Sequence, residues 1–333
     1  MNQSALKNIL KKCIPTPLIT TLKRVKNKRK ADRFMKFDMN KIIKLTSSTC
    51  FEQNITAIII KYHAIEKGLT MPNRRLGFGS NPLNYLIDRL NTHIDQFGDK
   101  HEQIQAALQV VAEYKLLHQE NNYELNPELS KKIDKLLQKT NTTCTSRQIE
   151  MTRAAYFAAS DASFETFSKS RRSIRSFEGG VEMEKVLAAI ELAQTAPSAC
   201  NRQSTRVKVI TDKDTMSKAL DVQGGNRGFG QLVDKLIVLT TEMNNWDIES
   251  SKGGYLDGGI YTMNLLYALH YHKIGACSLN CFFSPEKDKK MREIITIPAT
   301  ENFIVMIALG NVPEHFLVAN SHKYPSDQIT TIY

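Results

Sequence analysis

The second half of this chain alternates between helical and strand-like patterns, and this alternation restricts the fold more than any other feature. The run Leu236-Ile237-Val238-Leu239, for example, has the length and composition of a buried strand. Strands separated by helices predict a layered α/β or α+β domain, in which helices cover a sheet. The predicted strands are 206–211, 235–241, 276–280 and 303–309, and the predicted helices are 181–194, 214–222, 255–272 and 285–294.

The stretch before this alternation shows helical spacing only. In its first segment Ile55, Ile58, Tyr62 and Ile65 recur on one side of a helix. The same reasoning predicts helices at 51–66, 83–97, 100–119, 127–139 and 147–159. We therefore divide the chain into a basic leader (residues 1–41), an all-helical extension (residues 42–160) and a C-terminal domain (residues 161–333).

The formal net charge of +11 comes almost entirely from the leader. Residues 1–41 contain 12 of the 45 lysines and arginines, but only two acidic residues. Basic segments bind anionic lipid headgroups with roughly 1 kcal/mol per residue near the surface. Peripheral membrane binding and a solvated, partly disordered tail are both compatible with this composition. Small apolar faces that would assist membrane binding are Leu6, Ile9 and Leu10, and then Leu18, Leu22 and Val25.

Other properties of the sequence exclude several classes of protein. No run of 18 uncharged apolar residues occurs, and the N-terminus lacks a secretory pattern, so we expect neither a membrane span nor export. The six cysteines show no metal-site spacing and fit a reducing cytoplasm. If the basic leader binds lipid, the protein would lie at the inner face of the membrane. Nucleic-acid binding is not supported, because no aromatic-studded basic sheet or zinc motif accompanies the charge.

Two short strings in the C-terminal domain indicate chemistry. The first is Arg171-Arg172-Ser173-Ile174-Arg175-Ser176-Phe177. An arginine donates two parallel hydrogen bonds to a phosphate and stays charged, and a serine hydroxyl adds another donor. Cations this close repel one another unless an anion lies among them. The alternative is a solvated basic loop.

The second string, Ala196-Pro197-Ser198-Ala199-Cys200-Asn201-Arg202-Gln203, follows after one predicted helix. Pro197 would end that helix. In an extended loop Asn201 and Gln203 would point to the same side, where their amides could contact a planar ligand. Together the strings supply what flavin mononucleotide (FMN) needs, namely phosphate-binding cations and ring-binding amides. We interpret Cys200 as a small packing residue, since no histidine is near it in sequence.

These strings resemble the nitroreductase family of FMN-dependent oxidoreductases, which is marked by Arg-Arg-Ser-x-Arg-x-Phe followed by Pro-Ser-x-x-Asn-x-Gln. A long helix that begins near Asp257-Gly258-Gly259 and a late strand that ends at Gly310 are further marks in the same order. The resemblance covers residues 164–329. It implies an α+β fold with a mixed sheet flanked by helices, and a homodimer with FMN at the subunit interface.

The resemblance also implies which residues bind the cofactor. The first string would bind the phosphate, the ribityl chain and the N1/O2 side of FMN, and the second string would line the ring. A basic residue after the last strand would complete the phosphate site, and no catalytic side chain is expected because the flavin carries the chemistry. The implied cofactor-binding residues are Arg171, Arg172, Ser173, Arg175, Pro197, Ser198, Asn201, Gln203 and Lys323.

Three further patterns have two interpretations each. The glycine-rich segment 223–230 is not a GxGxxG motif and precedes a strand, so we predict no dinucleotide fold. The hypothesis is that its Arg227 and Phe229 shape a substrate or nicotinamide pocket, and the alternative is a simple turn. The arginine-rich segment 71–82 is interpreted as a connector, the alternative being a cover over a substrate pocket. His63 and Glu66 are interpreted as a polar pair, because two ligands do not make a metal site.

We therefore expect an FMN-dependent oxidoreductase. It would transfer hydride from NADH or NADPH through the flavin to a small electron-poor acceptor, such as a nitroaromatic, a quinone or an enone. Two alternatives remain open. One is a flavoenzyme of the same fold with a dedicated biosynthetic substrate, which the helical extension favours. The other is a non-catalytic adaptor, with a vestigial flavin site, that docks on a membrane or a partner.

Overall fold

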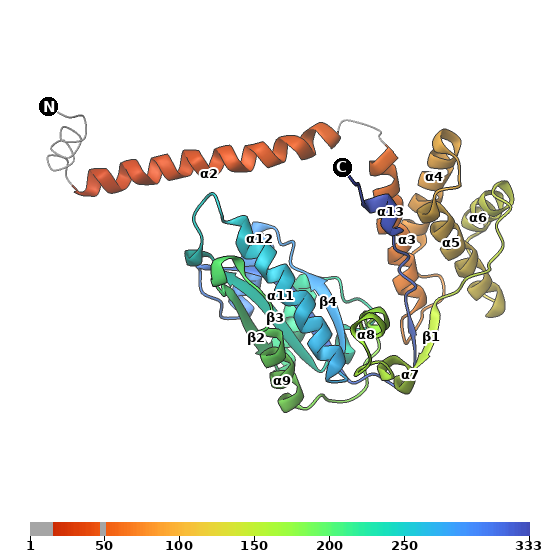
Figure 1. The fold of residues 1–333 in the computed structure, drawn as a ribbon. Helices are drawn as coiled ribbons and strands as arrows, with labels where there is room; N and C mark the ends of the chain where they lie inside the picture. The colour runs from red at the N-terminus through yellow and green to blue at the C-terminus, as the bar shows by residue number, and fades with distance from the viewer. Residues whose placement is uncertain (1–15, 47–50) are drawn as a thin grey trace.

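The computed structural model describes residues 16–46 and 51–333. Helix α2 (Thr16–Thr46) is a long single helix that runs past the C-terminal domain (Figure 1), where Lys30 pairs with Glu249 at 2.6 Å. Leu18, Leu22 and Val25 are exposed on it, whereas Leu6, Ile9 and Leu10 lie outside the described residues. Within the described ranges, no helix has the length and apolar character needed to cross a membrane.

Four helices of the extension pack around a core of their own: α3 (Phe51–Leu69), α4 (Ser80–Phe97), α5 (Glu102–Glu120) and α6 (Pro127–Lys139). Their existence confirms the helices predicted there. Helix α6 shows why the prediction works. Asn126 accepts hydrogen bonds from the backbone N–H groups of Glu128 and Leu129, and proline occupies the first helical position. Its apolar stripe is buried in the shared core.

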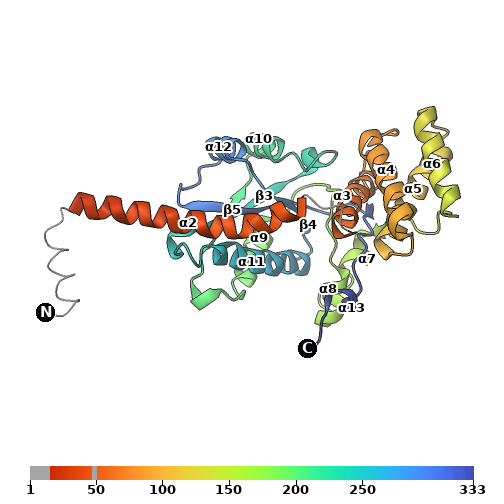
Figure 2. The ribbon, with the colours of Figure 1, turned by 90° about the horizontal axis from the view of Figure 1, so that it is seen from above.

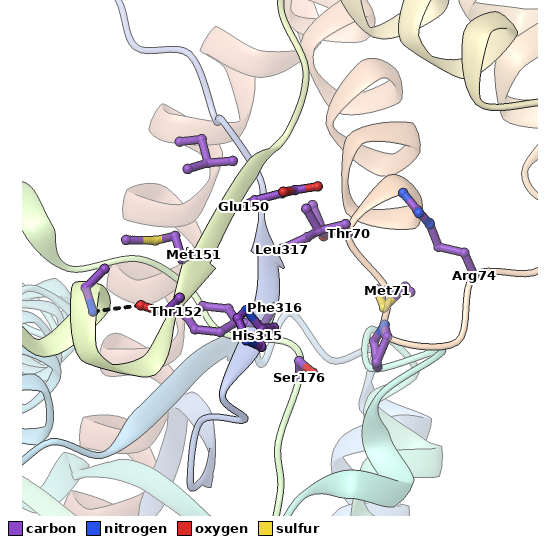
Figure 3. A pocket seen from close by; sticks show the side chains of 13 residues that line it. Thr70, Met71, Arg74, Glu150, Met151, Thr152, Ser176, His315, Phe316 and Leu317 are labelled. Atoms are coloured by element: carbon purple, nitrogen blue, oxygen red, sulfur yellow. Dashed lines mark hydrogen bonds between the residues drawn. The ribbon is translucent and has the colours of Figure 1, made fainter. Parts of the chain in front are cut away.

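The helix predicted at 147–159 is wrong. Strand β1 (Ile149–Thr152) and the short helix α7 (Arg153–Phe157) occupy this segment, and β1 pairs antiparallel with β6 (His315–Val318). The pairing with a distant strand outweighs the local preference for helix, and Thr152 then caps α7 by accepting from the Ala155 N–H. Figure 3 shows this two-stranded junction, where β1, β6 and Ser176 face Thr70, Met71 and Arg74 across a cavity of about 680 Å³.

The C-terminal domain contains a four-stranded sheet in the order β2-β3-β5-β4. The strands are β2 (Thr205–Ile210), β3 (Lys235–Glu242), β4 (Gly275–Asn280) and β5 (Glu301–Gly310). Helices α9 (Met183–Ala193) and α11 (Lys252–Tyr271) cover one face, and α10 (Lys213–Gln223) and α12 (Pro285–Ile294) cover the other (Figure 2). The predicted α+β class is confirmed. Short helices α8 (Phe164–Ser170) and α13 (Ser326–Ile329) complete the domain.

The sheet differs from the expected mixed sheet in one respect, since all of its strand pairs are antiparallel among the described residues. A single helix between two strands returns the chain for a parallel pair. Here residues 224–234 follow α10 and cross the domain a second time. Strand β3 therefore begins at the end of the sheet where β2 ends, and the two strands run antiparallel.

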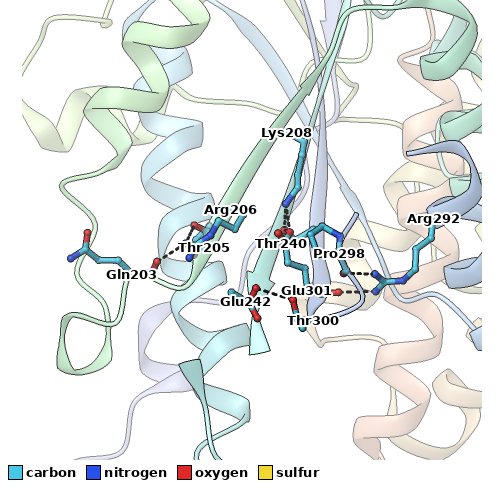
Figure 4. Close-up of polar contacts among 10 residues, drawn as sticks. All are labelled: Gln203, Thr205, Arg206, Lys208, Thr240, Glu242, Arg292, Pro298, Thr300 and Glu301. Carbon is cyan, nitrogen blue, oxygen red and sulfur yellow. Dashed lines mark hydrogen bonds and ion pairs between the residues drawn. The ribbon is translucent and has the colours of Figure 1, made fainter. Parts of the chain in front are cut away.

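A buried polar network ties three strands and one helix together (Figure 4). The Glu301 carboxylate on β5 accepts from the Lys208 ammonium on β2 and from the Thr240 hydroxyl on β3. Arg292 of α12 donates to the backbone oxygens of Glu301 at 2.7 Å and Pro298 at 2.9 Å. Removing one partner would leave a buried charge unpaired, so the network fixes the register of these strands.

Candidate functional site

The structure brings the predicted phosphate-binding residues into one cavity of about 430 Å³. Arg171, Arg172, Ser173 and Arg175 line it from one side, and Lys323 lines it from the C-terminal segment. We call this the Arg171–Lys323 cavity. The remaining wall includes Ile59, Tyr62 and His63 of helix α3, which belongs to the extension.

The first string presents its cations because it runs as extended chain beside β4. The Ile174 N–H donates to the Ala276 oxygen at 2.9 Å, and the Ile174 and Phe177 side chains are buried in the core. Side chains alternate along extended chain, so Arg171, Ser173 and Arg175 face the other way. Arg172 is held by the backbone of the preceding residues, since its guanidinium donates to the Lys169 oxygen at 2.6 Å and to the Arg171 oxygen at 3.1 Å.

The side chains that line this cavity include four with a permanent positive charge and no aspartate or glutamate. The one carboxylate beside the wall is Glu66, which contacts the lining residues His63 and Ser321. Within the described part of the chain, Arg171, Arg175 and Lys323 form no ion pair. A further cation, Lys67 of α3, lies near Arg175, and both burial and the charge of Arg175 lower the pKa of Lys67. Such an arrangement favours a bound anion.

His63 and Glu66 form the polar pair that the sequence predicted, with His63 Nδ1 and Glu66 Oε2 2.8 Å apart. The second Glu66 oxygen accepts from the Ser321 N–H at 2.8 Å. The pair therefore ties the segment that carries Lys323 to helix α3. No group of three or more metal-ligating side chains suited to an ion occurs among the described residues.

The second string is a tight turn, and the extended loop predicted for it is wrong. Cys200, Asn201 and Gln203 adopt left-handed conformations, with φ of 50°, 53° and 50°. The turn closes because Ser198 Oγ accepts from the Gln203 N–H at 3.0 Å. Strained backbone of this kind clusters at ligand sites. Cys200 is exposed, so its interpretation as a packing residue is also wrong.

The two strings lie near opposite ends of helix α11. The Asp257 carboxylate, in the first part of the helix, accepts from the Ala199 N–H of the second string at 3.0 Å. Near the other end, His270 Nε2 is 2.8 Å from Ser170 Oγ, next to Arg171. The helical rise between Asp257 and His270 is roughly 20 Å. Pro197, Ser198, Asn201 and Gln203 are therefore not among the residues that line the Arg171–Lys323 cavity.

The structure contradicts the pocket hypothesis for Phe229, and for Arg227 the hypothesis stays a prediction. Phe229 is buried in the domain core, with its ring centroid 6.2 Å from that of Phe177. Gly228, at φ +92°, turns the chain so that Phe229 points inward. Arg227 is exposed and lines a separate cavity of about 690 Å³, together with Arg74 and Arg75. The segment 71–82 thus covers a cavity, and is more than a connector.

Sequence reasoning missed the contribution of the extension. Tyr62, His63 and Lys67 of α3 lie at or beside the Arg171–Lys323 cavity. The sequence gives no local signal for these positions. The apolar residues of α3 predict the side that faces the helical core, but not what the opposite side of the helix contacts. Asp257 was noted only as the start of a long helix, and its hydrogen bond to Ala199 N–H was not foreseen.

A comparison with protein families finds that residues 168–226 match the model of the nitroreductase family. The predicted resemblance to the nitroreductase family is confirmed. The match includes the first string, helix α9 and the second string, so both predicted parts of the flavin site lie within it. The rest of the nitroreductase-like domain, and the extension, lie outside the matched residues.

Solved structures similar to this chain align with about half of it. A protein of Parabacteroides distasonis is 23% identical, with 48% of this chain and 92% of that chain covered and a TM-score of 0.43. An FMN-dependent nitroreductase of Clostridium difficile is 22% identical, with 49% and 92% covered and a TM-score of 0.39. A nitroreductase family protein of Clostridium novyi is 21% identical, with 44% and 84% covered and a TM-score of 0.39. A search of curated proteins finds no significant match.

Proposed function

We propose that this protein is an FMN-dependent oxidoreductase that transfers hydride from NADH or NADPH to an electron-poor acceptor. The single observation that carries the proposal is the Arg171–Lys323 cavity, in which several cations and a serine hydroxyl converge. The nitroreductase-family match of residues 168–226 supports a flavin oxidoreductase in general terms. A nitroaromatic, quinone or enone acceptor is the finer part of the proposal.

The residues of the cavity fit the phosphate end of FMN. A phosphate ester carries nearly two negative charges and three acceptor oxygens. Arg171 and Arg175 can each donate two parallel hydrogen bonds, Ser173 can donate one, and Lys323 adds a point charge. When bound, FMN would supply the hydride chemistry between the nicotinamide and the acceptor. The positive charge of Arg175 and Lys67 would stabilise negative charge on the nearby edge of the ring.

We propose that the protein works as a homodimer, in which the second string of one chain meets the first string of the other. The separation of the two strings along α11 supports this arrangement. So does an apolar stripe on the outer side of α11, where Leu256 is 65% exposed, Ile260 37% and Met263 37%. Exposed apolar residues at this helical spacing suit a second copy of the chain.

Mixed dimers test this proposal directly. Arg171→Ala chains and Asn201→Ala chains would each bind FMN poorly as homodimers. Mixing and reassembling the two should restore binding, because one of the two sites in a mixed dimer then has both strings intact. No restoration, in a mixture shown by mass spectrometry to contain mixed dimers, would contradict the shared site. A wild-type chain that sediments as a monomer with FMN bound would contradict it as well.

A second candidate function is the same chemistry on a dedicated biosynthetic substrate. The observation that favours it is that α3, outside the family match, supplies part of the wall of the Arg171–Lys323 cavity. An extension that reaches the cofactor site can select the substrate. Poor turnover of quinones and nitroaromatics by fully FMN-loaded protein would favour this candidate, and fast turnover would oppose it.

We also propose a weak peripheral membrane contact through the leader. The lysines and arginines at positions 23–30 of α2 lie on an exposed helix beside the exposed Leu18, Leu22 and Val25. Co-sedimentation with anionic vesicles should decrease when residues 1–41 are removed, and should decrease with salt. Equal co-sedimentation of the truncated chain would refute the contact.

A further inference from the structure

A second cavity lies where the extension meets the glycine-rich segment of the nitroreductase-like domain. Its volume is about 690 Å³. Lys67, Arg74 and Arg75 line it from helix α3 and the loop that follows, and Arg227 lines it from the domain. We call this the Arg75–Arg227 cavity.

The walls of this cavity are held together by a close contact. A Cβ added at Gly228 would lie 3.0 Å from Met71 Sδ, so the two segments touch at this glycine. Met71 also packs against the core of the nitroreductase-like domain. On the loop side, the Arg74 guanidinium donates to the Leu69 oxygen at 3.0 Å, which fixes the turn at the end of α3. The cavity is thus a built feature of the junction.

All the charged residues that line the Arg75–Arg227 cavity are cations. Four of its lining residues are Lys or Arg, and none is Asp or Glu. Across residues 16–46 and 51–333, none of these four forms an ion pair. The cavity at the β1–β6 junction differs, because Glu150 is among its lining residues. Uncompensated cations in one concave site repel one another, and a bound polyanion relieves that repulsion.

Helix α3 connects this cavity to the proposed FMN site. Tyr62 and His63 line the Arg171–Lys323 cavity, and Ala64 and Lys67 line the Arg75–Arg227 cavity. His63 and Ala64 are consecutive, and Lys67 lies four residues beyond His63, a rise of about 6 Å. The charge of Arg175 also acts on Lys67, which places the two cationic sites within electrostatic range. A ligand held in the second cavity would therefore lie beside the cofactor.

We propose that the Arg75–Arg227 cavity binds the phosphate group of a substrate that reacts at the flavin. This inference rests on the proposed function and adds the chemical class of the substrate. Arginine forks match the oxygens of a phosphate, and the glycines at positions 224, 225 and 228 leave the rim free of side chains. The phosphate belongs either to the nicotinamide co-substrate, which would then be NADPH, or to a phosphorylated acceptor.

Inorganic pyrophosphate is the probe that tests the site. FMN-saturated wild-type protein is titrated calorimetrically with pyrophosphate, so that the first cavity is already filled. The variant is Arg75→Ala/Arg227→Ala. The matched control is Lys131→Ala/Lys135→Ala, which removes the same charge from exposed positions on α6. We expect the variant to bind pyrophosphate at least about tenfold more weakly, and the control to bind as wild type does.

Two results would overturn the proposal: wild-type protein that binds no pyrophosphate, or a variant that binds it with wild-type affinity. FMN content is measured on the same samples. Wild-type protein that binds no FMN would contradict the proposed function. FMN-loaded protein that binds no pyrophosphate would contradict this inference alone. A variant that retains FMN shows that the substitutions left the cofactor site folded.

Anaerobic reduction of the bound flavin by NADPH and by NADH then identifies the source of the phosphate. If NADPH supplies the phosphate, the ratio of the NADPH rate to the NADH rate, measured at low nucleotide concentration, falls in the variant. If the acceptor supplies it, that ratio is unchanged while pyrophosphate binding is still lost.

Discussion

The carboxylate of Glu66 accepts a hydrogen bond of 2.8 Å from the backbone N–H of Ser321, a residue 255 positions later in the chain. One residue belongs to the helical extension, and the other precedes Lys323 in the segment that closes the proposed phosphate site. Glu66 is 2% exposed and also pairs with His63. This contact makes the extension part of the proposed cofactor site.

Glu66→Ala should therefore weaken both folding and FMN binding. It leaves the half-buried Ser321 N–H without its charged acceptor, at a cost of about 1–3 kcal/mol in the free energy of unfolding. Lys323 would lose its fixed position, so FMN affinity should fall as well. Urea unfolding and FMN titration measure the two effects, with the exposed Glu124→Ala as control. Unchanged FMN affinity in Glu66→Ala would show that the contact is structural only.

Arg171→Ala should lose much of its bound FMN. A charge-assisted phosphate contact contributes about 1.5–3 kcal/mol, which corresponds to roughly a 10- to 150-fold increase in Kd. The control Arg29→Ala removes the same charge from an exposed position on α2 and should bind FMN as wild type does. Fluorescence titration with FMN gives both constants. Wild-type affinity in Arg171→Ala would remove Arg171 from the phosphate site.

His270 should make the fold less stable as the pH falls from about 6.5 to about 4. Burial, followed by the charges of Arg171 and Arg172, lowers the pKa of His270 to about 4. In this pH window the unfolded chain binds a proton that the folded chain does not, so stability is present at higher pH and is lost on acidification. The full contribution is of the order of 3 kcal/mol.

The variant His270→Phe tests this dependence. Its ring would lie among Tyr156, Phe157 and Phe167, which already surround the imidazole. The difference in unfolding free energy between pH 7.5 and pH 5 should be smaller in His270→Phe than in wild type, whereas His272→Asn should keep the wild-type difference. Equal pH dependence in wild type and His270→Phe would contradict the buried neutral imidazole.

Gly228→Ala should destabilise the junction between the extension and the domain. The position has φ +92°, and the new Cβ would press on Met71. The left-handed backbone alone costs an alanine roughly 1 kcal/mol. Gly179→Ala is the matched control, because Gly179 has φ +70° and no atom within 4 Å of an added Cβ. Gly228→Ala should therefore lose more stability than Gly179→Ala in urea unfolding. Equal losses would mean that the Met71 contact is easily relieved.

The sequence predicts the bounds of a helix or strand well where local signals agree on where the element begins and ends. Helix α6 and helix α12 have the predicted bounds, since a cap residue and a proline at the first helical position agree in each, and α6 adds a buried apolar stripe. Strand β1 could not be predicted, because its partner β6 is far away in sequence and the pairing outweighs local preference. The long helix α2 was missed because its charge pattern resembles that of a solvated tail.

The sequence identified some of the residues of the candidate site, but not how these residues come together in the fold. Arg171, Arg172, Ser173 and Arg175 could be singled out because a phosphate requires such a cluster, and they do line one cavity. The extension residues Tyr62, His63 and Lys67 carry no such mark, and their role depends on how two domains pack. Phe229 was misplaced because a sequence does not show which way a glycine turns the chain. Asn201 and Gln203 were given an extended geometry that the left-handed turn replaces.

The most direct test of the central claim is the visible spectrum of the purified full-length protein, followed by denaturation and identification of the released chromophore. The account predicts a yellow protein that releases about one FMN per chain, or takes up that amount when FMN is added. A colourless protein that takes up no added FMN would contradict it. The cations of the Arg171–Lys323 cavity would then have to bind some other anion.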